Sequence, residues 1–491
     1  MPREDWLSFT RAGAPWVDFE WLCQLLWLGL YRVGGFPALL ALKAALLAGA
    51  GAALWSTLAL YKLPVAARGP WLLAWALALL PANDLRPENF SVLFFGLQWR
   101  WLERDRLSPR LRASPAERAG AAGFFMLWAN LHAGFAYGLL LQALATVLAE
   151  AKSRRRLAEL LVFGALGTLA NPAGPGLYPV LLEHAAGLGE LSGTIREWQA
   201  PSFADPWLLP FWALLAAVFA AAIRGLRSGR LTLLHLVALA FFALSAVRHV
   251  RTIPYFAAVA VPVAAAALGW AARPAARAAA WAAALVLGAF WAARVAPELA
   301  AARAFIPRYA PEGLARFLDG GREALGGKRL FHPIPWGGFL GYRLGPAYPI
   351  FADGRYLFHD LLKTVEEARR EPEAFRRFLD GLGVDVVLLQ AGSQSVSTDV
   401  LLKDGRKLAV RRPAYLFFMP RADWALVYWD RDGSAFVRRS SAPRAWVERR
   451  EYRLYRPGDL EAAELLVRDG LARPEELRAE RERWLREQDP S

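Results

Sequence analysis

The sequence has almost no cysteine and, over its first 300 residues, little charge. Cys23 is the single cysteine among 491 residues, which excludes an intrachain disulfide and a zinc site built on cysteines. Residues 1–300 contain 26 Lys and Arg and 16 Asp and Glu, whereas residues 301–491 contain 33 and 28. The first part is too apolar for a soluble core and the second too polar for a bilayer. This composition excludes a soluble enzyme, a disordered chain and a disulfide-stapled secreted module.

Long apolar runs fill the first part of the chain. A bilayer core about 30 Å thick is crossed by about 20 apolar residues as a helix. The clearest runs are Phe36–Tyr61, Trp207–Ile223, Leu231–Val247, Ile253–Ala271 and Ala278–Val295, and shorter ones are Pro70–Leu80, Phe90–Leu102 and Leu157–Ala170. These runs and the stretch described next predict about ten membrane segments.

The stretch Ala119–Leu148 is too long for one span and is interrupted by the polar residues of Asn130–Gly134. Short or broken helices are tolerated in membranes where they face protein or a watery cavity. The pattern therefore predicts two short helices that meet near His132.

Basic residues are distributed unevenly between the connections of these runs. The connections 62–68, 100–118, 152–156, 224–230 and 271–277 contain 17 Lys and Arg, and the alternate set of 1–35, 82–88, 171–205 and 248–251 contains 7. The positive-inside rule places the first set in the cytoplasm and everything after Val295 outside. The net charge of +15 is thus explained by topology, and we expect no nucleic-acid partner.

Beyond Pro297 the pattern is typical of a small α/β domain. Apolar runs predict strands at Arg329–His332, Tyr348–Ala352, Val384–Leu389, Ala425–Tyr428 and Ala435–Val437, the last two joined as a hairpin by Asp430–Gly433. Helical patterns cover Pro311–Leu325, Phe358–Arg369, Glu373–Gly381 and the highly charged, exposed Leu460–Gln488.

The expected architecture is a polytopic α-helical membrane bundle followed by a small extracytoplasmic α/β domain. We assign 1–35 to a first extracytoplasmic loop with an amphipathic helix, 36–296 to the transmembrane domain, 297–458 to the α/β domain and 459–491 to charged C-terminal helices. The start lacks the apolar core of a cleavable signal peptide. An outward amino terminus without a preceding span predicts a further helix upstream of Met1.

Ionisable residues in membrane segments are energetically expensive, so their positions are informative. Most of them fall at the predicted external ends of the spans. The candidate catalytic residues are Asp18, Glu20 and His132, and the candidate substrate-binding residues are Asp84, Arg86, Asn130, Asn171, Glu197, Trp198, Arg248, His249 and Arg251.

This mixture suits transfer from a phosphate carrier. A carboxylate can act as general base on a hydroxyl, arginines can bind and stabilise a phosphate leaving group, and aromatic rings can stack on sugars. Structural alternatives stay open: Asp18 and Glu20 as solvated loop residues, Arg86 as a bridge to Asp84, and His132 as a packing histidine. Arg248, His249 and Arg251 are equally consistent with a headgroup-level anchor, whereas His235, His332 and His359 are interpreted as structural.

Several segments resemble the C-type glycosyltransferase superfamily (GT-C), and more narrowly a bacterial group of polytopic proteins with a C-terminal extracytoplasmic domain. The resemblance covers most of the chain with diffuse motifs. It lies in Pro15–Leu22, Arg86–Pro87 with Phe90–Ser91, Trp128–Phe135, Asn171–Pro172, Glu197–Trp198, Arg248–His249, Gly337–Arg343 and Asp353–Arg355.

The resemblance implies a membrane helical bundle that uses a polyprenyl-phosphate or polyprenyl-diphosphate sugar donor. It implies a catalytic acidic residue in the first extracytoplasmic loop, just after the first membrane helix. Here no membrane helix precedes that loop, and relatives have an Asp-rich, Trp-containing stretch ahead of the point where Met1 stands. Asp18 and Glu20 are the acidic residues that this sequence offers, as base or as ligands of a divalent metal (Mg or Mn).

The leading hypothesis is a bacterial inner-membrane glycosyltransferase with its C-terminal domain outside. It would move a hexose or pentose from a polyprenyl-phosphate carrier to a glycan, lipid or protein acceptor. The alternative hypothesis is a non-catalytic polytopic protein, a transporter or an envelope scaffold, whose outer domain binds a ligand. Transporters usually contain inverted repeats with paired broken helices, and only one break is visible here.

Overall fold

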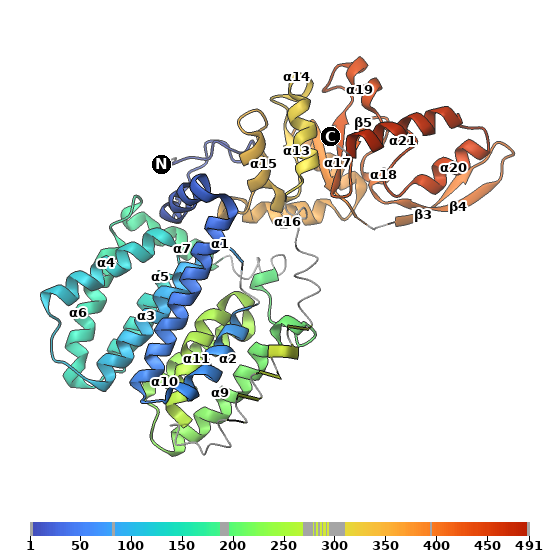
Figure 1. Cartoon of the computed structure of the whole chain (residues 1–491). Helices are drawn as coiled ribbons and strands as arrows, with labels where there is room; N and C mark the ends of the chain where they lie inside the picture. The colour runs from blue at the N-terminus through green and yellow to red at the C-terminus, as the bar shows by residue number, and fades with distance from the viewer. Residues whose placement is uncertain are drawn as a thin grey trace. The chain divides into compact units, whose positions relative to one another are not determined.

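Figure 1 shows a computed structural model of the chain, which describes residues 3–80, 84–186, 196–268, 310–392 and 395–488, with scattered residues between 278 and 293. The chain divides into two compact units. One comprises Met1–Trp16 with Ala301–Ser491, and the other comprises Val17–Ala300. The expected combination of a helical unit and a small unit that contains a sheet is confirmed. The stretch assigned to a first loop, 1–35, is shared between the two units.

The helical unit is a bundle of packed helices, drawn in blue to green in Figure 1. Its helices are α1 (Trp21–Leu60), α2 (Val65–Leu79), α3 (Glu88–Leu107), α4 (Pro115–Leu131), α5 (Phe135–Val147), α6 (Ala151–Thr168), α7 (Leu177–Ala186), α9 (Leu209–Arg227), α10 (Leu233–Arg248) and α11 (Ile253–Leu268), with 3₁₀ turns η3 (Arg196–Trp198), η4 (Pro206–Leu208) and η5 (Val250–Thr252).

Three helical segments are long and apolar enough to cross a membrane, namely Trp21–Leu60, Pro206–Arg227 and Val250–Leu268. The helices α2, α5 and α10 are apolar but shorter. The expected count of about ten spans is thus not supported among the described residues, because several apolar runs form helices too short to cross alone. The predicted span Ala278–Val295 lies largely outside the described residues.

The long helix α1 contains a kink at Gly34 and Gly35, directly before the apolar run Phe36–Tyr61. Gly34 and Gly35 have non-helical backbone angles, and Gly35 lies at φ 60° and ψ −153°, a region open essentially only to glycine. The chain on the far side of the kink, from Phe36 onward, is the apolar run that the sequence predicts to span.

Helix α11 forms the centre of the helical unit. In the most apolar window of its span 83% of the residues are buried, against 33% for α1 and 28% for the segment containing α9. A helix that is apolar all round belongs inside a bundle, whereas helices with large exposed apolar faces suit contact with lipid. The break near His132 is confirmed, since α4 ends at Leu131 and His132 is extended before α5 begins at Phe135.

The second unit is built around a four-stranded mixed sheet in the order β1-β2-β6-β5, shown in yellow to red in Figure 1. Strands β1 and β2 are parallel, and the β2–β6 and β6–β5 pairs are antiparallel. The strands are β1 (Leu330–Phe331), β2 (Val386–Gln390), β5 (Trp424–Trp429) and β6 (Gly433–Arg438), with a separate hairpin of β3 (Ser395–Leu401) and β4 (Lys407–Pro413).

Helices cover this sheet and complete two apolar cores. They are α13 (Glu312–Gly320), α14 (Arg322–Leu325), α15 (Gly337–Leu344), α16 (His359–Ala368), α17 (Pro372–Gly381), α18 (Tyr415–Phe418), α19 (Arg444–Arg450), α20 (Leu460–Arg468) and α21 (Pro474–Gln488), with turns η6 (Ile334–Trp336) and η7 (Tyr356–Phe358). The predicted helices and the β5–β6 hairpin are confirmed, and β3 and β4 were not predicted.

The predicted strand at Tyr348–Ala352 is reduced to isolated bridges at Ile350. One of them joins Ile350 to Ser8, and the amide of Phe9 donates to the Ile350 carbonyl at 3.0 Å. The other joins Ile350 to Leu330, so Ile350 bridges β1 and the amino-terminal segment. The segment Asp353–Arg355 is a turn, as predicted, in which Asp353 accepts from the Arg355 amide at 3.0 Å.

Candidate functional site

Ionisable side chains from five segments meet at one end of the helical unit. They come from the chain before α1, the loop before α3, the α4–α5 break, η3 and η5. We call this group the Glu20 cluster and define it as Glu20, Arg86, Glu88, His132, Glu197 and Arg251. All six belong to the unit Val17–Ala300, and ion pairs or close approaches connect them.

Glu20 lies directly before α1, and its side chain is 28% exposed. Burial raises the pKa of the Glu20 carboxyl to about 7, with Asp18 and Glu88 acting in the same direction and Arg251 and Arg86 opposing it. A carboxyl group with a pKa near neutrality is suited to take up and release protons. Of the two acidic residues predicted in the first loop, Glu20 is the one that faces the cluster.

His132 is almost completely buried and faces Glu20. The distance between His132 Nε2 and Glu20 Oε1 is 3.8 Å, longer than a hydrogen bond. The other ring nitrogen, Nδ1, lies 2.7 Å from Ser91 Oγ and 3.0 Å from the Gly134 amide, which donates to it. The ring is thus held firmly on one side and left open toward Glu20 on the other.

The two arginines of the cluster are already paired with carboxylates. Arg251 Nη1 donates to Glu197 Oε1 at 3.1 Å, and its Nε lies 3.6 Å from Glu88 Oε2. Arg86 forms an ion pair with Glu197 as well, so that Glu197 bridges both guanidinium groups. Arg251 also lies over the ring of Trp198, with its central carbon 4.9 Å from the ring centroid. This ring orients Arg251 through a cation–π contact.

Four of the predicted site residues have clear structural roles. Asn130 uses its amide fully, accepting from Trp21 Nε1 at 2.7 Å and donating to two backbone carbonyls. Asn171 closes the turn after α6 through the Thr168, Ala173 and Gly174 backbone. His249 Nδ1 lies 2.7 Å from the Trp198 carbonyl. Asp18 accepts from the Glu20 amide and from Gln24.

Two further predicted residues lie at the edge of the cluster or outside it. Asp84 is exposed and pairs with Arg86 at 3.5 Å, so the predicted structural bridge is present. Arg248 is exposed at the end of α10 and forms no ion pair with a residue that the structure describes. The prediction that Arg248 joins the arginines at the site therefore receives no support.

Sequence reasoning did not assign a site role to four buried residues, namely Glu88 in the cluster and Ser91, Trp128 and Tyr255 beside it. Glu88 and Ser91 lie three residues apart at the start of α3, which places them on one helix face. That spacing was a usable signal. Tyr255 gave no signal in the sequence; its hydroxyl is buried and has no hydrogen-bond partner among the described residues.

The cluster does not fit the divalent metal that the resemblance allows. Among the described residues, no group of three His, Cys, Asp or Glu side chains could hold a metal ion. Glu88 and Glu197 face guanidinium groups instead. The arrangement favours acid–base and anion chemistry based on side chains.

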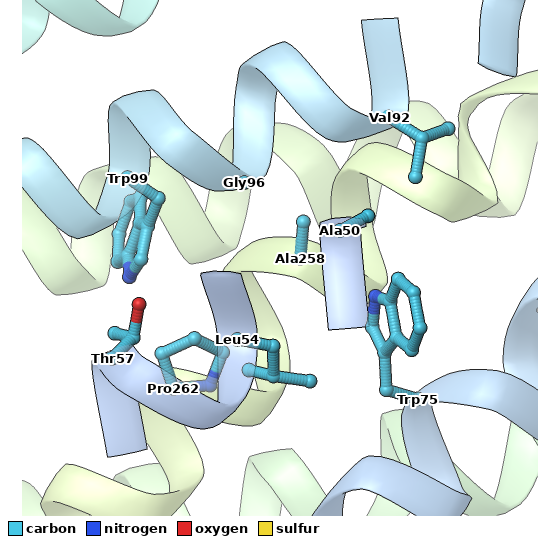
Figure 2. Close-up of a pocket in the computed structure, with 9 residues that line it drawn as sticks. All are labelled: Ala50, Leu54, Thr57, Trp75, Val92, Gly96, Trp99, Ala258 and Pro262. Atoms are coloured by element: carbon cyan, nitrogen blue, oxygen red, sulfur yellow. The ribbon is translucent and has the colours of Figure 1, made fainter. Parts of the chain in front are cut away.

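Two cavities in the helical unit are apolar. Figure 2 shows the smaller one, of about 10 Å³, enclosed by side chains of α1, α2, α3 and α11. It has room for about one water. There the Thr57 hydroxyl and the Trp99 indole nitrogen face one another, and Trp99 Nε1 has no hydrogen-bond partner in the described part of the chain. The larger cavity, of about 200 Å³, is lined mostly by α2 and α9. Neither contains a residue of the Glu20 cluster.

No protein-family profile matches the chain, and no curated protein is significantly similar to it.

Proposed function

We propose that the chain is a membrane glycosyltransferase that moves a sugar from a polyprenyl-phosphate carrier to an acceptor hydroxyl, with the Glu20 cluster as its active site. The observation that carries the proposal is the half-buried Glu20 carboxyl, with a pKa near 7, in one cluster with two arginines. A base and anion receptors are the two functions that this transfer needs. The resemblance to GT-C enzymes supplies the substrate class.

In the proposed reaction Glu20 is the general base. Its carboxylate takes the proton of the acceptor hydroxyl while the hydroxyl oxygen forms a bond to the anomeric carbon of the sugar. The bond between that carbon and the carrier phosphate oxygen breaks, and the electron pair leaves with the phosphate. Because attack and departure take place on opposite faces, the anomeric configuration is inverted.

Arg86 and Arg251 are proposed to receive the charge that develops on the phosphate. Planar guanidinium groups bind phosphate oxygens through paired hydrogen bonds. Since Glu197 bridges both arginines, it would be displaced from one or both when the phosphate binds. Until the substrate arrives, Glu197 neutralises the charge of the two arginines and thus competes with the phosphate for them.

Three apolar segments long enough to span support a location in a membrane. We propose the bacterial inner membrane, further spans built from paired short helices, and an extracytoplasmic position for the Glu20 cluster and the sheet unit. The uneven distribution of basic residues between connections supports this orientation. The acceptor would accordingly be a glycan, lipid or protein of the cell envelope.

The test is sugar transfer by the full chain in lipid nanodiscs, supplied with a panel of polyprenyl-phosphate hexoses and pentoses. We expect release of polyprenyl phosphate by the wild type and a loss of about 10²–10⁴-fold in Glu20→Gln, which removes the base without changing shape. Asp18→Asn is the matched control and should retain most of the activity, because Asp18 accepts from the Glu20 backbone amide and the Gln24 side chain.

The alternative function is tested on the same protein in proteoliposomes. Movement of a labelled glycan or polyprenyl-phosphate sugar across the bilayer, without release of polyprenyl phosphate, would replace the transferase by a transporter. Full transferase activity in Glu20→Gln would remove Glu20 from the chemistry.

A further inference from the structure

We infer that Trp128, Ser91 and the Gly134 amide hold His132 as a neutral imidazole with its proton on Nε2, directed at Glu20. His132 is thus a positioning residue for the base rather than a base itself. The inference rests on the proposed function for the role of Glu20, whereas the state of the ring follows from hydrogen bonds alone.

The Gly134 amide is the first of two donors that together keep the proton off His132 Nδ1. Its N–H donates to His132 Nδ1 at 3.0 Å. An N–H cannot donate to a nitrogen that has its own hydrogen, so Nδ1 presents its lone pair. The remaining proton of a neutral ring lies on Nε2, the nitrogen that faces Glu20.

Ser91 and Trp128 reinforce this state from the other side. The indole N–H of Trp128 donates to Ser91 Oγ at 2.7 Å. Ser91 Oγ lies 2.7 Å from His132 Nδ1 and directs its single proton there. Ser91 and Trp128 are completely buried, and His132 is 4% exposed. A sealed chain of this kind has no water with which to exchange partners, so it holds the direction of its donors.

Gly134 is required for this approach. A Cβ atom at position 134 would lie 2.3 Å from Ser91 Oγ and 2.6 Å from the Tyr255 hydroxyl. Contacts below 3.0 Å are essentially never formed by real Cβ atoms. The helix break at His132 thus directs the Gly134 backbone amide toward the His132 ring, at a position where a larger side chain does not fit.

The consequence for Glu20 concerns its orientation. With Nδ1 occupied by donors, His132 would have to break the Gly134 and Ser91 hydrogen bonds to accept a proton there. The Nε2–H group, 3.8 Å from Glu20 Oε1, needs a shift of one side chain to form a hydrogen bond with the carboxylate. That hydrogen bond would direct the second carboxylate oxygen at the acceptor hydroxyl.

The experiment is nitrogen NMR of the full chain in nanodiscs with ¹⁵N-labelled histidine. The chain contains 6 histidines, and the His132 signals are identified by their loss in His132→Gln. We expect a neutral ring with an unprotonated Nδ1 and a protonated Nε2. Ser91→Ala and Trp128→Phe should produce a mixture of the two neutral forms. Trp99→Phe is the matched control, because Trp99 is equally buried and its N–H has no partner among the described residues.

Kinetics test the role of the ring. Ser91→Ala and Trp128→Phe should lower kcat by about 10- to 100-fold with little change in KM, since a misdirected base affects the chemical step. His132→Gln, which retains an N–H near the Nε2 position, should be more active than His132→Ala. A protonated Nδ1 in the wild type would overturn the inference.

The two proposals fail in distinguishable ways. Altered ring signals in Ser91→Ala with unchanged kcat would overturn the positioning role but leave the hydrogen-bonded state of His132 intact. Full activity of Glu20→Gln would overturn the proposed base and leave the NMR result standing.

Discussion

Two Glu–His pairs lie at different places among the described residues of the helical unit, and they differ in how many hydrogen bonds the glutamate accepts. In the first pair, His132 Nε2 lies 3.8 Å from Glu20 Oε1. In the second, His235 Nε2 lies 2.9 Å from Glu103 Oε1, and Glu103 also accepts from Tyr61 at 2.7 Å and from Arg106 at 2.8 Å. We call Tyr61, Glu103, Arg106 and His235 the Glu103 cluster.

Both histidines accept a hydrogen bond at Nδ1, the ring nitrogen that points away from the glutamate. A backbone amide donates to Nδ1 in each, Gly134 for His132 and Thr232 for His235. The difference lies in the glutamate. Glu103 is 1% exposed, and both of its oxygens accept hydrogen bonds. Glu20 is 28% exposed, and its carboxylate lies too far from His132 Nε2 to accept a hydrogen bond from it. A Glu–His pair in which every carboxylate oxygen accepts hydrogen bonds, here called saturated, thus stabilises the fold. A pair in which the glutamate lacks such bonds, here called open, is available to react with a substrate.

The largest expected effect is on stability, from the saturated pair. Glu103→Ala leaves His235, Tyr61 and Arg106 without an acceptor in a sealed site, which we expect to destabilise the chain by about 3–5 kcal/mol. Thermal unfolding in nanodiscs measures this. Glu20→Ala, at the open pair, should change stability by no more than about 1 kcal/mol. Equal destabilisation by both variants would contradict the distinction between the pairs.

His332, in the sheet unit, is a further buried histidine, and its protonation makes the stability of that unit depend on pH. Burial lowers the pKa of His332 to about 4 from an ordinary 6.5. Between pH 4 and pH 6.5 the unfolded chain binds a proton at His332 that the folded chain does not bind. The free energy of unfolding therefore has its full value above pH 6.5 and decreases as the pH falls to 4. The loss should reach about 3 kcal/mol.

Hydrogen exchange of the sheet unit between pH 7 and pH 4 measures the loss. His332→Gln should remove this part of the pH dependence. A pH dependence identical in wild type and His332→Gln would rule out His332 as its source.

Titration of Glu20 should determine how the rate of sugar transfer depends on pH. The base must be deprotonated, and burial raises the pKa of Glu20 to about 7, among Asp18, Glu88, Arg86, Arg251 and the neutral His132. The transfer rate should therefore be constant above pH 7 and fall about tenfold per unit below it. Rates of polyprenyl-phosphate release from pH 5 to pH 9 measure the profile. A rate that stays constant down to pH 5 would exclude Glu20 as the titrating base.

The smallest effect concerns the arginines that Glu197 bridges. Glu197→Gln weakens its hold on Arg86 and Arg251, so we expect tighter binding of polyprenyl phosphate by about 1 kcal/mol, a few-fold in Kd. Binding to nanodisc-embedded protein by titration measures it. Asp84→Asn, which affects only the exposed pair with Arg86, is the control. Weaker binding in Glu197→Gln would show that Glu197 orients the arginines rather than competing with phosphate.

The sequence predicted the elements that follow from local patterns. Period-2 and period-3.6 patterns located β1, β2, β5 and β6 and the helices α13, α14, α16, α17, α20 and α21, and the polar interruption located the α4–α5 break. Helices α15, α18 and α19 were not predicted. The predicted count of about ten spans is not supported among the described residues, because apolarity alone does not distinguish a helix that crosses the membrane from a short one buried by its neighbours. Strands β3 and β4, which lack a buried apolar face over most of their length, gave no such pattern.

The candidate site was predicted at the level of loops but not of individual roles. Glu20, Arg86, His132, Glu197 and Arg251 do meet, as expected from their positions at one end of the helices. Asn130, Asn171 and His249 instead hold the backbone, because their side chains lie beside carbonyls and amides that only the folded loops bring near.

Composition and periodicity by themselves determined that this chain has an apolar helical part and a charged α/β part, since both follow from local hydrophobic patterning. Tertiary structure decided which glutamate is saturated and which is open. That choice depends on distances between side chains more than a hundred residues apart, such as Glu20 and His132 or Glu103 and His235. No local pattern encodes those distances, because packing of the helices sets them.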